Sequence, residues 1–160
     1  MKIFLIKIIV WLFNTNQNRV GYVLKAASLS LVSVMLIGII IFPIFPDLES
    51  PEIDGGLFGF FSVVIISPVV ETLILWLFIY ISGIFMKGTW KISAVSALLF
   101  ALVHSLMVPV WGLTIFLSFV VFSIAFIEWR KVSKMNAYLI CCSIHMVHNL
   151  TSFVIYQIFS

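Results

Sequence analysis

Residues 57–86 read LFGFFSVVIISPVVETLILWLFIYISGIFM, and this stretch decides the fold. It is apolar throughout except for small hydroxyl residues and one carboxylate, Glu71, and it is longer than the roughly 20 residues that a helix needs to cross a bilayer. A carboxylate in hydrocarbon is costly, and a chain keeps one where it faces a polar interior and has a function there. Glu71 is therefore a candidate functional residue, with a helix-packing hydrogen bond as the structural alternative.

The composition of the whole chain agrees with a membrane protein. Of the 160 residues, 63% are hydrophobic and 9% are charged, and the mean hydropathy is +1.26. Soluble domains carry about 25% charged residues. We expect one all-α membrane domain over residues 1–160, and we read the net charge of +3 as loop charge rather than affinity for nucleic acid. Cys141 and Cys142 are neighbours in an apolar run and are interpreted as small apolar side chains, not as a disulfide or a metal pair.

The apolar runs predict about five transmembrane helices. They cover residues 26–45, 57–86, 92–108, 110–127 and 135–159, and residues 1–13 are too short to span and predict an interfacial helix. Pro68 removes a backbone donor one turn before Glu71, so we expect a kink there, while Ser67 shares the face of Glu71. The run 110–127 has no ionisable residue and is expected to be scaffold.

Five spans place every Lys and Arg on one side of the membrane. The acidic loop 47–56 and the C-terminus then lie on the other side. The positive-inside rule therefore predicts a multi-pass protein of the cell membrane, with its N-terminus in the cytoplasm and its C-terminus outside.

Counting from the basic ends at about 1.5 Å per residue puts the candidate polar residues at one depth. His104 lies roughly 20 Å from Lys91, and Glu71 lies roughly 24 Å from Lys87. His145 and Asn149 lie roughly 17 and 23 Å from Lys134. Polar groups from three helices thus fall in a layer about 7 Å thick, and we expect them to meet.

The last span carries a polar stripe. His145, His148, Asn149 and Ser152 follow the spacing i, i+3, i+4, i+7, which is one helical face. Such a stripe faces the protein interior, either for function or as hydrogen bonds between helices.

Three chemistries suit these groups. In the first, Glu71 is the general base for a water that His104 positions, and His145 and Asn149 donate to an oxyanion. In the second, Glu71, His104, His145 and His148 bind a metal, although no HExxH motif is present. In the third, the same groups form a proton or ion path, which one acidic residue supports poorly.

Three short motifs occur in order along the chain. Residues 68–76 read PVVETLILW, residues 100–104 read FALVH, and residues 145–149 read HMVHN; FIEWRK precedes the last span at 126–131. Over residues 60–153 the chain resembles the CPBP family (CAAX proteases and bacteriocin-processing enzymes, also called Abi), which is defined by EExxxR, FxxxH and HxxxN. The second and third motifs are intact, whereas Thr72 and Trp76 replace the second Glu and the Arg of the first.

The resemblance implies an intramembrane glutamic endopeptidase that needs no metal or other cofactor. Glu71 and His104 would activate water, and His145 and Asn149 would form the oxyanion site. Its partners would be the lipid bilayer and a membrane protein or peptide substrate, not nucleic acid. The loss of both extra charges from motif one leaves an alternative, a non-catalytic CPBP-like scaffold or bacteriocin-immunity protein.

Overall fold

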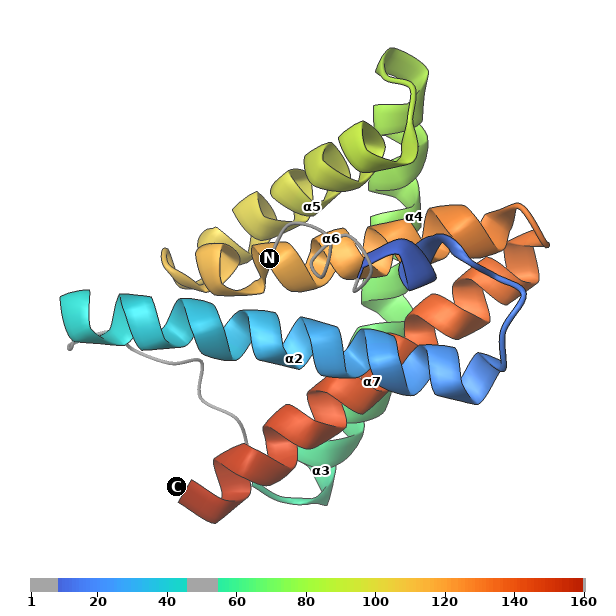
Figure 1. The fold of residues 1–160 in the computed structure, drawn as a ribbon. Coiled ribbons are helices and arrows are strands. Elements are labelled where there is room, and N and C mark those ends of the chain that lie inside the picture. Colours follow the sequence, from blue (N-terminus) through green and yellow to red (C-terminus); the bar gives the residue numbers. More distant parts are fainter. Residues whose placement is uncertain (1–8, 46–54, 160) are drawn as a thin grey trace.

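The computed structural model describes residues 9–45 and 55–159, and all regular structure in these two ranges is helical. Four helical stretches are long and apolar enough to cross a membrane, and the fifth, α5, is shorter, with 17 residues. The elements in chain order are η1 (Trp11–Phe13), α2 (Arg19–Ile44), α3 (Leu57–Phe60), η2 (Phe61–Ile66), α4 (Ser67–Phe85), α5 (Thr89–Ser105), α6 (Trp111–Arg130) and α7 (Lys134–Phe159). The predicted helical membrane bundle is confirmed (Figure 1).

The helix boundaries differ from the predicted spans mainly at α2, which begins at Arg19 rather than at 26. Asn18 caps the helix, because its side-chain oxygen accepts a hydrogen bond from the Gly21 amide at 3.0 Å. The span prediction followed hydropathy alone and therefore missed the polar first turns. Most of the predicted interfacial helix (1–13) and of the acidic loop (47–56) lies outside the described residues.

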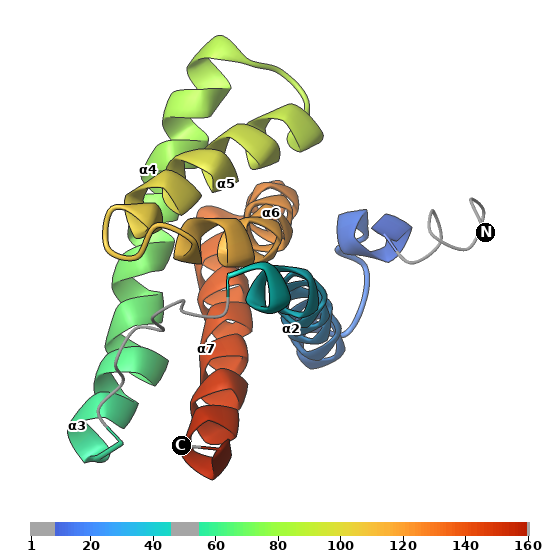
Figure 2. The same cartoon turned by 90° about the vertical axis from the view of Figure 1, so that its left-hand side faces the viewer.

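Helix α6 is the centre of the bundle. In its most apolar window 61% of the residues are buried, compared with 28% for the stretch Leu57–Phe85. Figures 1 and 2 show α6 between α5 on one side and α2 and α7 on the other, in agreement with its contacts to all three. The expectation that this span is scaffold agrees with its position.

The contact between α5 and α6 is close because small residues meet there. Ala97 and Ala101 are buried on α5, and a side chain at Gly112 of α6 would lie 2.0 Å from the Ala101 carbonyl oxygen. Only glycine allows this approach. The short α5–α6 turn is thereby held against α5, which fixes the position of His104 at the end of that helix.

A π-helical segment precedes the proline of the long second span. The Ser67 amide bonds the Ser62 carbonyl, five residues back, at the end of η2. Continuing this pattern would pair residue 68 with Val63, but Pro68 has no N–H to donate. The irregular turns therefore lie ahead of Pro68, and not beside Glu71 as predicted, since α4 is regular from Ser67 onward.

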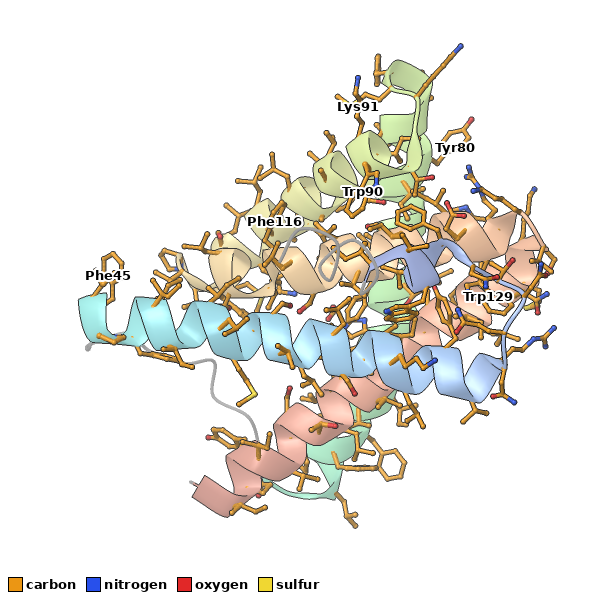
Figure 3. All side chains as sticks on the ribbon, viewed as in Figure 1. Phe45, Tyr80, Trp90, Lys91, Phe116 and Trp129 are labelled. Carbon is orange, nitrogen blue, oxygen red and sulfur yellow. The ribbon has the colours of Figure 1, made fainter. Side chains whose placement is uncertain are left out.

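The helix ends that carry the basic residues gather at one end of the bundle. The Arg19 guanidinium lies 6.0 Å from the ring centre of Trp129, and Thr89 donates to Glu128 at 2.9 Å. Figure 3 shows Trp129 at this end and Phe45 at the opposite end. The prediction that every Lys and Arg lies on one side of the membrane stays a prediction.

The N-terminal segment packs against the same end. Leu12 is buried, and its carbonyl accepts a hydrogen bond from the Tyr22 hydroxyl at 2.9 Å. Phe13 lies beside Trp90 of α5, with ring centres 5.3 Å apart. The described part of this segment thus belongs to the packed bundle.

Candidate functional site

Glu71 of α4 lies at the meeting point of three helices. Its Oε2 is 3.8 Å from Nε2 of His104 on α5 and 3.6 Å from Nε2 of His145 on α7. The side chains of Glu71, His104 and His145 are 20%, 11% and 5% exposed, so the cluster is mostly buried and opens at the carboxylate. The predicted convergence of these three residues is confirmed.

Ser67 fixes the other carboxylate oxygen. Its hydroxyl lies one turn before Glu71 on the same face and donates a hydrogen bond to Oε1. Oε2 is therefore the oxygen left to face the two imidazoles. Within the described residues no Lys or Arg pairs with Glu71, so its polar neighbours are neutral or titratable.

The backbone sets the orientation of the His104 ring. Nδ1 lies 3.1 Å from the carbonyl oxygen of Phe100, one turn earlier on α5. A carbonyl only accepts hydrogen bonds, so Nδ1 carries the proton and Nε2 of the neutral ring presents a lone pair toward Glu71. This tautomer is the one that accepts a hydrogen bond from a water bound at the carboxylate.

Aromatic rings enclose both imidazoles. The His104 ring lies 4.9 Å from Phe100 and 4.9 Å from Trp111, and the His145 ring lies 4.9 Å from Phe122 and 5.5 Å from Phe119. Phe119 also stacks on Phe100 at 4.0 Å. Packed rings restrict side-chain rotation, so the aromatic side chains of α6 help to hold the two imidazoles in place.

The separations within the cluster suit a shared water. Distances of 3.6 and 3.8 Å exceed a direct hydrogen bond, and contacts of this length are commonly bridged by water. A water within hydrogen-bonding reach of Glu71 Oε2 can bridge this oxygen to the Nε2 atom of His104 or of His145. The arrangement can thus hold a water between a carboxylate and an imidazole.

Asn149 is placed differently from its predicted role. Its Nδ2 donates to the Val63 carbonyl at 2.8 Å, and Val63 is the residue whose helical partner would have been Pro68. The carboxamide therefore replaces the donor that proline lacks. Nδ2 has a second N–H, so a role at an oxyanion stays a prediction that would use this remaining donor.

His148 turns to another helix. Its Nδ1 lies 2.7 Å from the hydroxyl of Ser30 on α2, and the Ser30 carbonyl accepts from Ser118 of α6 at 3.1 Å. In residues 9–45 and 55–159 no set of three or more His, Cys, Asp and Glu side chains is arranged to hold a metal ion. The alternative metal set with His148 stays a prediction, and His148 acts here as a link between helices.

The two residues of motif one that differ from the CPBP pattern, Thr72 and Trp76, occupy packed positions. Thr72 is 1% exposed, and Trp76 packs against Phe126 of α6 with ring centres 5.6 Å apart. Both side chains serve the contact of α4 with its neighbours. Both positions are therefore occupied by neutral side chains in packed surroundings.

Sequence reasoning missed the partners that lie far away in the chain. Ser30 and the Val63 carbonyl were not candidates, although a serine inside the first span is a signal for a polar contact. The two cysteines are free and buried, as expected from their apolar surroundings.

A search of known proteins finds no family, no curated protein and no solved structure that matches this chain.

Proposed function

We propose that this chain is an intramembrane endopeptidase of the CPBP type, which hydrolyses a peptide bond of a membrane-associated protein or peptide. The observation that carries the proposal is the convergence of Glu71, His104 and His145 from three helices, with both Nε2 atoms within 3.8 Å of one carboxylate oxygen. A carboxylate and two imidazoles that share a buried but accessible position can activate a water.

Glu71 is the general base in this mechanism. Its Oε2 removes a proton from the bound water, whose position is fixed by the lone pair on Nε2 of His104. The resulting hydroxide attacks the substrate carbonyl. His145, with the second N–H of Asn149, donates to the oxyanion, and the proton held by Glu71 passes to the leaving amine. The mechanism uses no metal.

The resemblance to CPBP motifs supports the same assignment. The intact FxxxH and HxxxN motifs supply His104 and His145, and the retained Glu of motif one supplies Glu71. The motif pattern and the three-helix cluster select the same residues, although one rests on spacing and the other on distance.

A non-catalytic role is the second candidate, and one observation favours it. Thr72 and Trp76 are packed against the bundle where the family has a charged pair. A bacteriocin-immunity or scaffold protein would need the fold and its surfaces but not the reaction. In that case Glu71 would serve only to join helices.

Quantitative peptidomics of membranes separates the two candidates. Cells produce wild type, Glu71→Gln or Glu128→Gln at matched levels; the last is a control that alters another buried glutamate away from the cluster. A protease yields peptides or new termini with wild type and the control, and none with Glu71→Gln. Identical profiles in all three, with the phenotype retained by Glu71→Gln, would establish the binding role.

The proposed location is the plasma membrane, with the N-terminus in the cytoplasm and the C-terminus outside. The gathering of Arg19, Arg130 and Lys134 at one end of the bundle supports this orientation. Reporter fusions after Ser105 and after Arg130 test it. A cytoplasmic reporter signal after Arg130 and an external signal after Ser105 are expected, and the reverse pattern would refute the orientation.

A further inference from the structure

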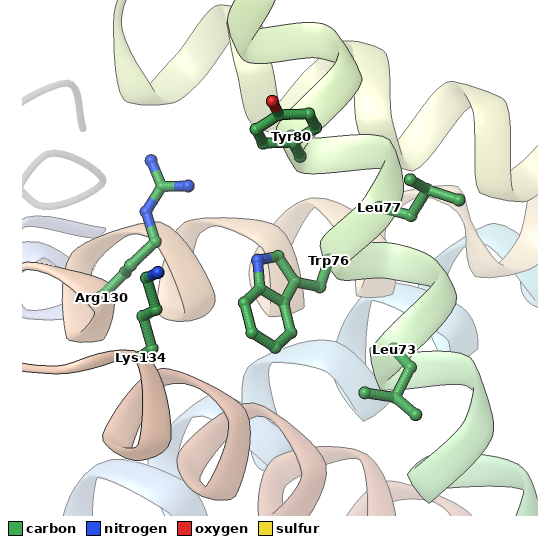
Figure 4. Close-up of a pocket in the computed structure, with 6 residues that line it drawn as sticks. All are labelled: Leu73, Trp76, Leu77, Tyr80, Arg130 and Lys134. Atoms are coloured by element: carbon green, nitrogen blue, oxygen red, sulfur yellow. The ribbon is translucent and has the colours of Figure 1, made fainter.

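A groove of about 640 Å³ lies between α4 and the α6–α7 turn, away from the Glu71 cluster. Its walls combine apolar, aromatic and cationic side chains, namely Leu73, Trp76, Leu77, Tyr80, Arg130 and Lys134. Figure 4 shows Arg130 and Lys134 side by side, across the groove from Trp76. Tyr80 is nine residues from Glu71, so at about 100° per residue it lies on the opposite face of α4.

The two cations of the groove are unpaired in the part of the chain that the structure describes. Lys131, between them in sequence, forms an ion pair with Glu128, whereas neither Arg130 nor Lys134 has an acidic partner or a side-chain hydrogen bond there. No acidic residue lines the groove. Two adjacent positive charges without a counter-charge select an anion.

The depth of the groove indicates the kind of anion. Arg130 and Lys134 lie at the basic end of the bundle, at the level where lipid headgroups are expected. Toward the bundle centre the wall continues as Leu77 and Leu73, which are 54% and 49% exposed. A ligand that matches this sequence of cationic residues followed by apolar residues has a charged head and an apolar chain.

The inner limit of the groove is also defined. The Tyr138 hydroxyl donates to the Val69 carbonyl at 3.2 Å and so joins α7 to α4 one turn below Lys134 and Leu73. A chain that enters beside Trp76 cannot continue between the helices and must follow the outward face of α4. This path leads into the surrounding bilayer rather than to Glu71.

We propose that this groove is a binding site for the headgroup of an anionic phospholipid. Arg130 and Lys134 bind the phosphate, the exposed Tyr80 hydroxyl donates to the headgroup, and the first part of an acyl chain lies against Leu73, Trp76 and Leu77. The site is independent of the proposed peptidase chemistry, because none of these residues touches the cluster.

Native mass spectrometry of the purified full chain tests the site. The protein in detergent is mixed with equal amounts of dioleoyl phosphatidylglycerol and dioleoyl phosphatidylcholine, and the ratio of the two bound lipids is measured. Wild type is expected to retain phosphatidylglycerol preferentially. The double variant Arg130→Gln/Lys134→Gln is expected to reduce that preference by about tenfold or more, since each cation near an anionic headgroup contributes substantially.

Two further variants make the result specific. Lys87→Gln/Lys91→Gln removes the same charge from exposed residues at the same end that do not line the groove, and it is expected to retain the preference. Arg130→Lys/Lys134→Arg keeps both charges and is also expected to retain it. An equal loss in the Lys87/Lys91 control would show attraction to overall positive charge and would overturn the site.

Competition with glycerol 1-phosphate distinguishes a lipid from a free phosphate. The acyl chain contributes apolar contacts, so excess glycerol 1-phosphate should leave bound phosphatidylglycerol in place. Displacement of the lipid by this competitor would make the groove a site for soluble anions and would refute the lipid assignment.

Discussion

The two glutamates in the described part of the chain, Glu71 and Glu128, lie in very different surroundings. Glu128 at the basic end is 3% exposed and is bound by the Lys131 ammonium and the Thr89 hydroxyl. Glu71 in the middle of the bundle has a serine and two imidazoles, and no cation with a permanent charge pairs with it among the described residues.

Under the proposed function, this difference separates a structural carboxylate from a reactive one. Glu128 is held by a hydrogen-bond donor and an ion-pair partner that fix its position at the end of α6. Imidazoles can exchange protons with a carboxylate, and the proposed peptidase mechanism requires such neighbours around Glu71. The neighbouring groups therefore differ in kind, with a lysine at Glu128 and two imidazoles at Glu71.

The largest expected effect is the loss of proteolysis in Glu71→Gln. Gln has nearly the same shape and can still accept the Ser67 hydrogen bond, but it cannot take a proton from water. We expect the rate of substrate cleavage to fall by about a thousandfold. The measurement is the cleavage of a substrate found by peptidomics, with protein level monitored by immunoblot.

Glu128→Gln is the matched control, and it is expected to leave the cleavage rate within about twofold, because a surface-linked ion pair contributes little. Equal losses in the two variants would remove the distinction between them and point to a general folding defect.

The next effect concerns the two imidazoles. His104→Gln and His145→Gln are each expected to lower the cleavage rate by about a hundredfold, since each removes one partner of the water or the oxyanion. The double variant should lose less than the product of the single effects, because the groups act as a unit. A single histidine variant with full activity would contradict the proposed roles.

A smaller effect is expected for the stability of the basic end. Glu128→Ala removes the acceptor of Thr89 and the partner of Lys131, and we expect a loss of about 1–2 kcal/mol in the free energy of unfolding. Lys131→Ala should cost less than about 1 kcal/mol, because this side chain is 63% exposed. Thermal unfolding in detergent compares the two variants, and a larger loss for Lys131→Ala would contradict the described pairing.

The smallest effect tests the link between Asn149 and Pro68. Asn149→Ala should destabilise the wild-type background by about 1 kcal/mol, because the Val63 carbonyl loses its donor. In a Pro68→Ala background the new amide can bond Val63, so the same change should cost less. Equal costs in both backgrounds, measured as a double-mutant cycle, would show that the two residues are not coupled.

The spans and the central cluster were predictable because each rests on a short-range rule. Hydropathy located five helices, and a count from Lys87 and Lys91 placed Glu71 and His104 at one depth. Helical spacing alone placed Ser67 on the same face as Glu71, and the structure adds the hydrogen bond between them. These features need no knowledge of how the helices cross.

The contact partners of the polar stripe on α7 were not predictable in the same way. Its members share a face, yet His145 meets Glu71, His148 meets Ser30 on α2, and Asn149 meets Val63 on η2. The partner of each side chain depends on helix crossing angles and on the π-helical turns. Neither property is expressed in the local spacing of residues.

The aromatic packing around the imidazoles has a consequence for mutational tolerance. Phe119 lies 5.7 Å from the His104 ring and 5.5 Å from the His145 ring, although it has no polar atom. In a saturation scan under selection for the protein's activity, this position should reject substitutions about as strictly as the histidines do. Such a scan would then show selective pressure on a hydrocarbon side chain, and a map of tolerated substitutions would outline the site more completely than its ionisable residues.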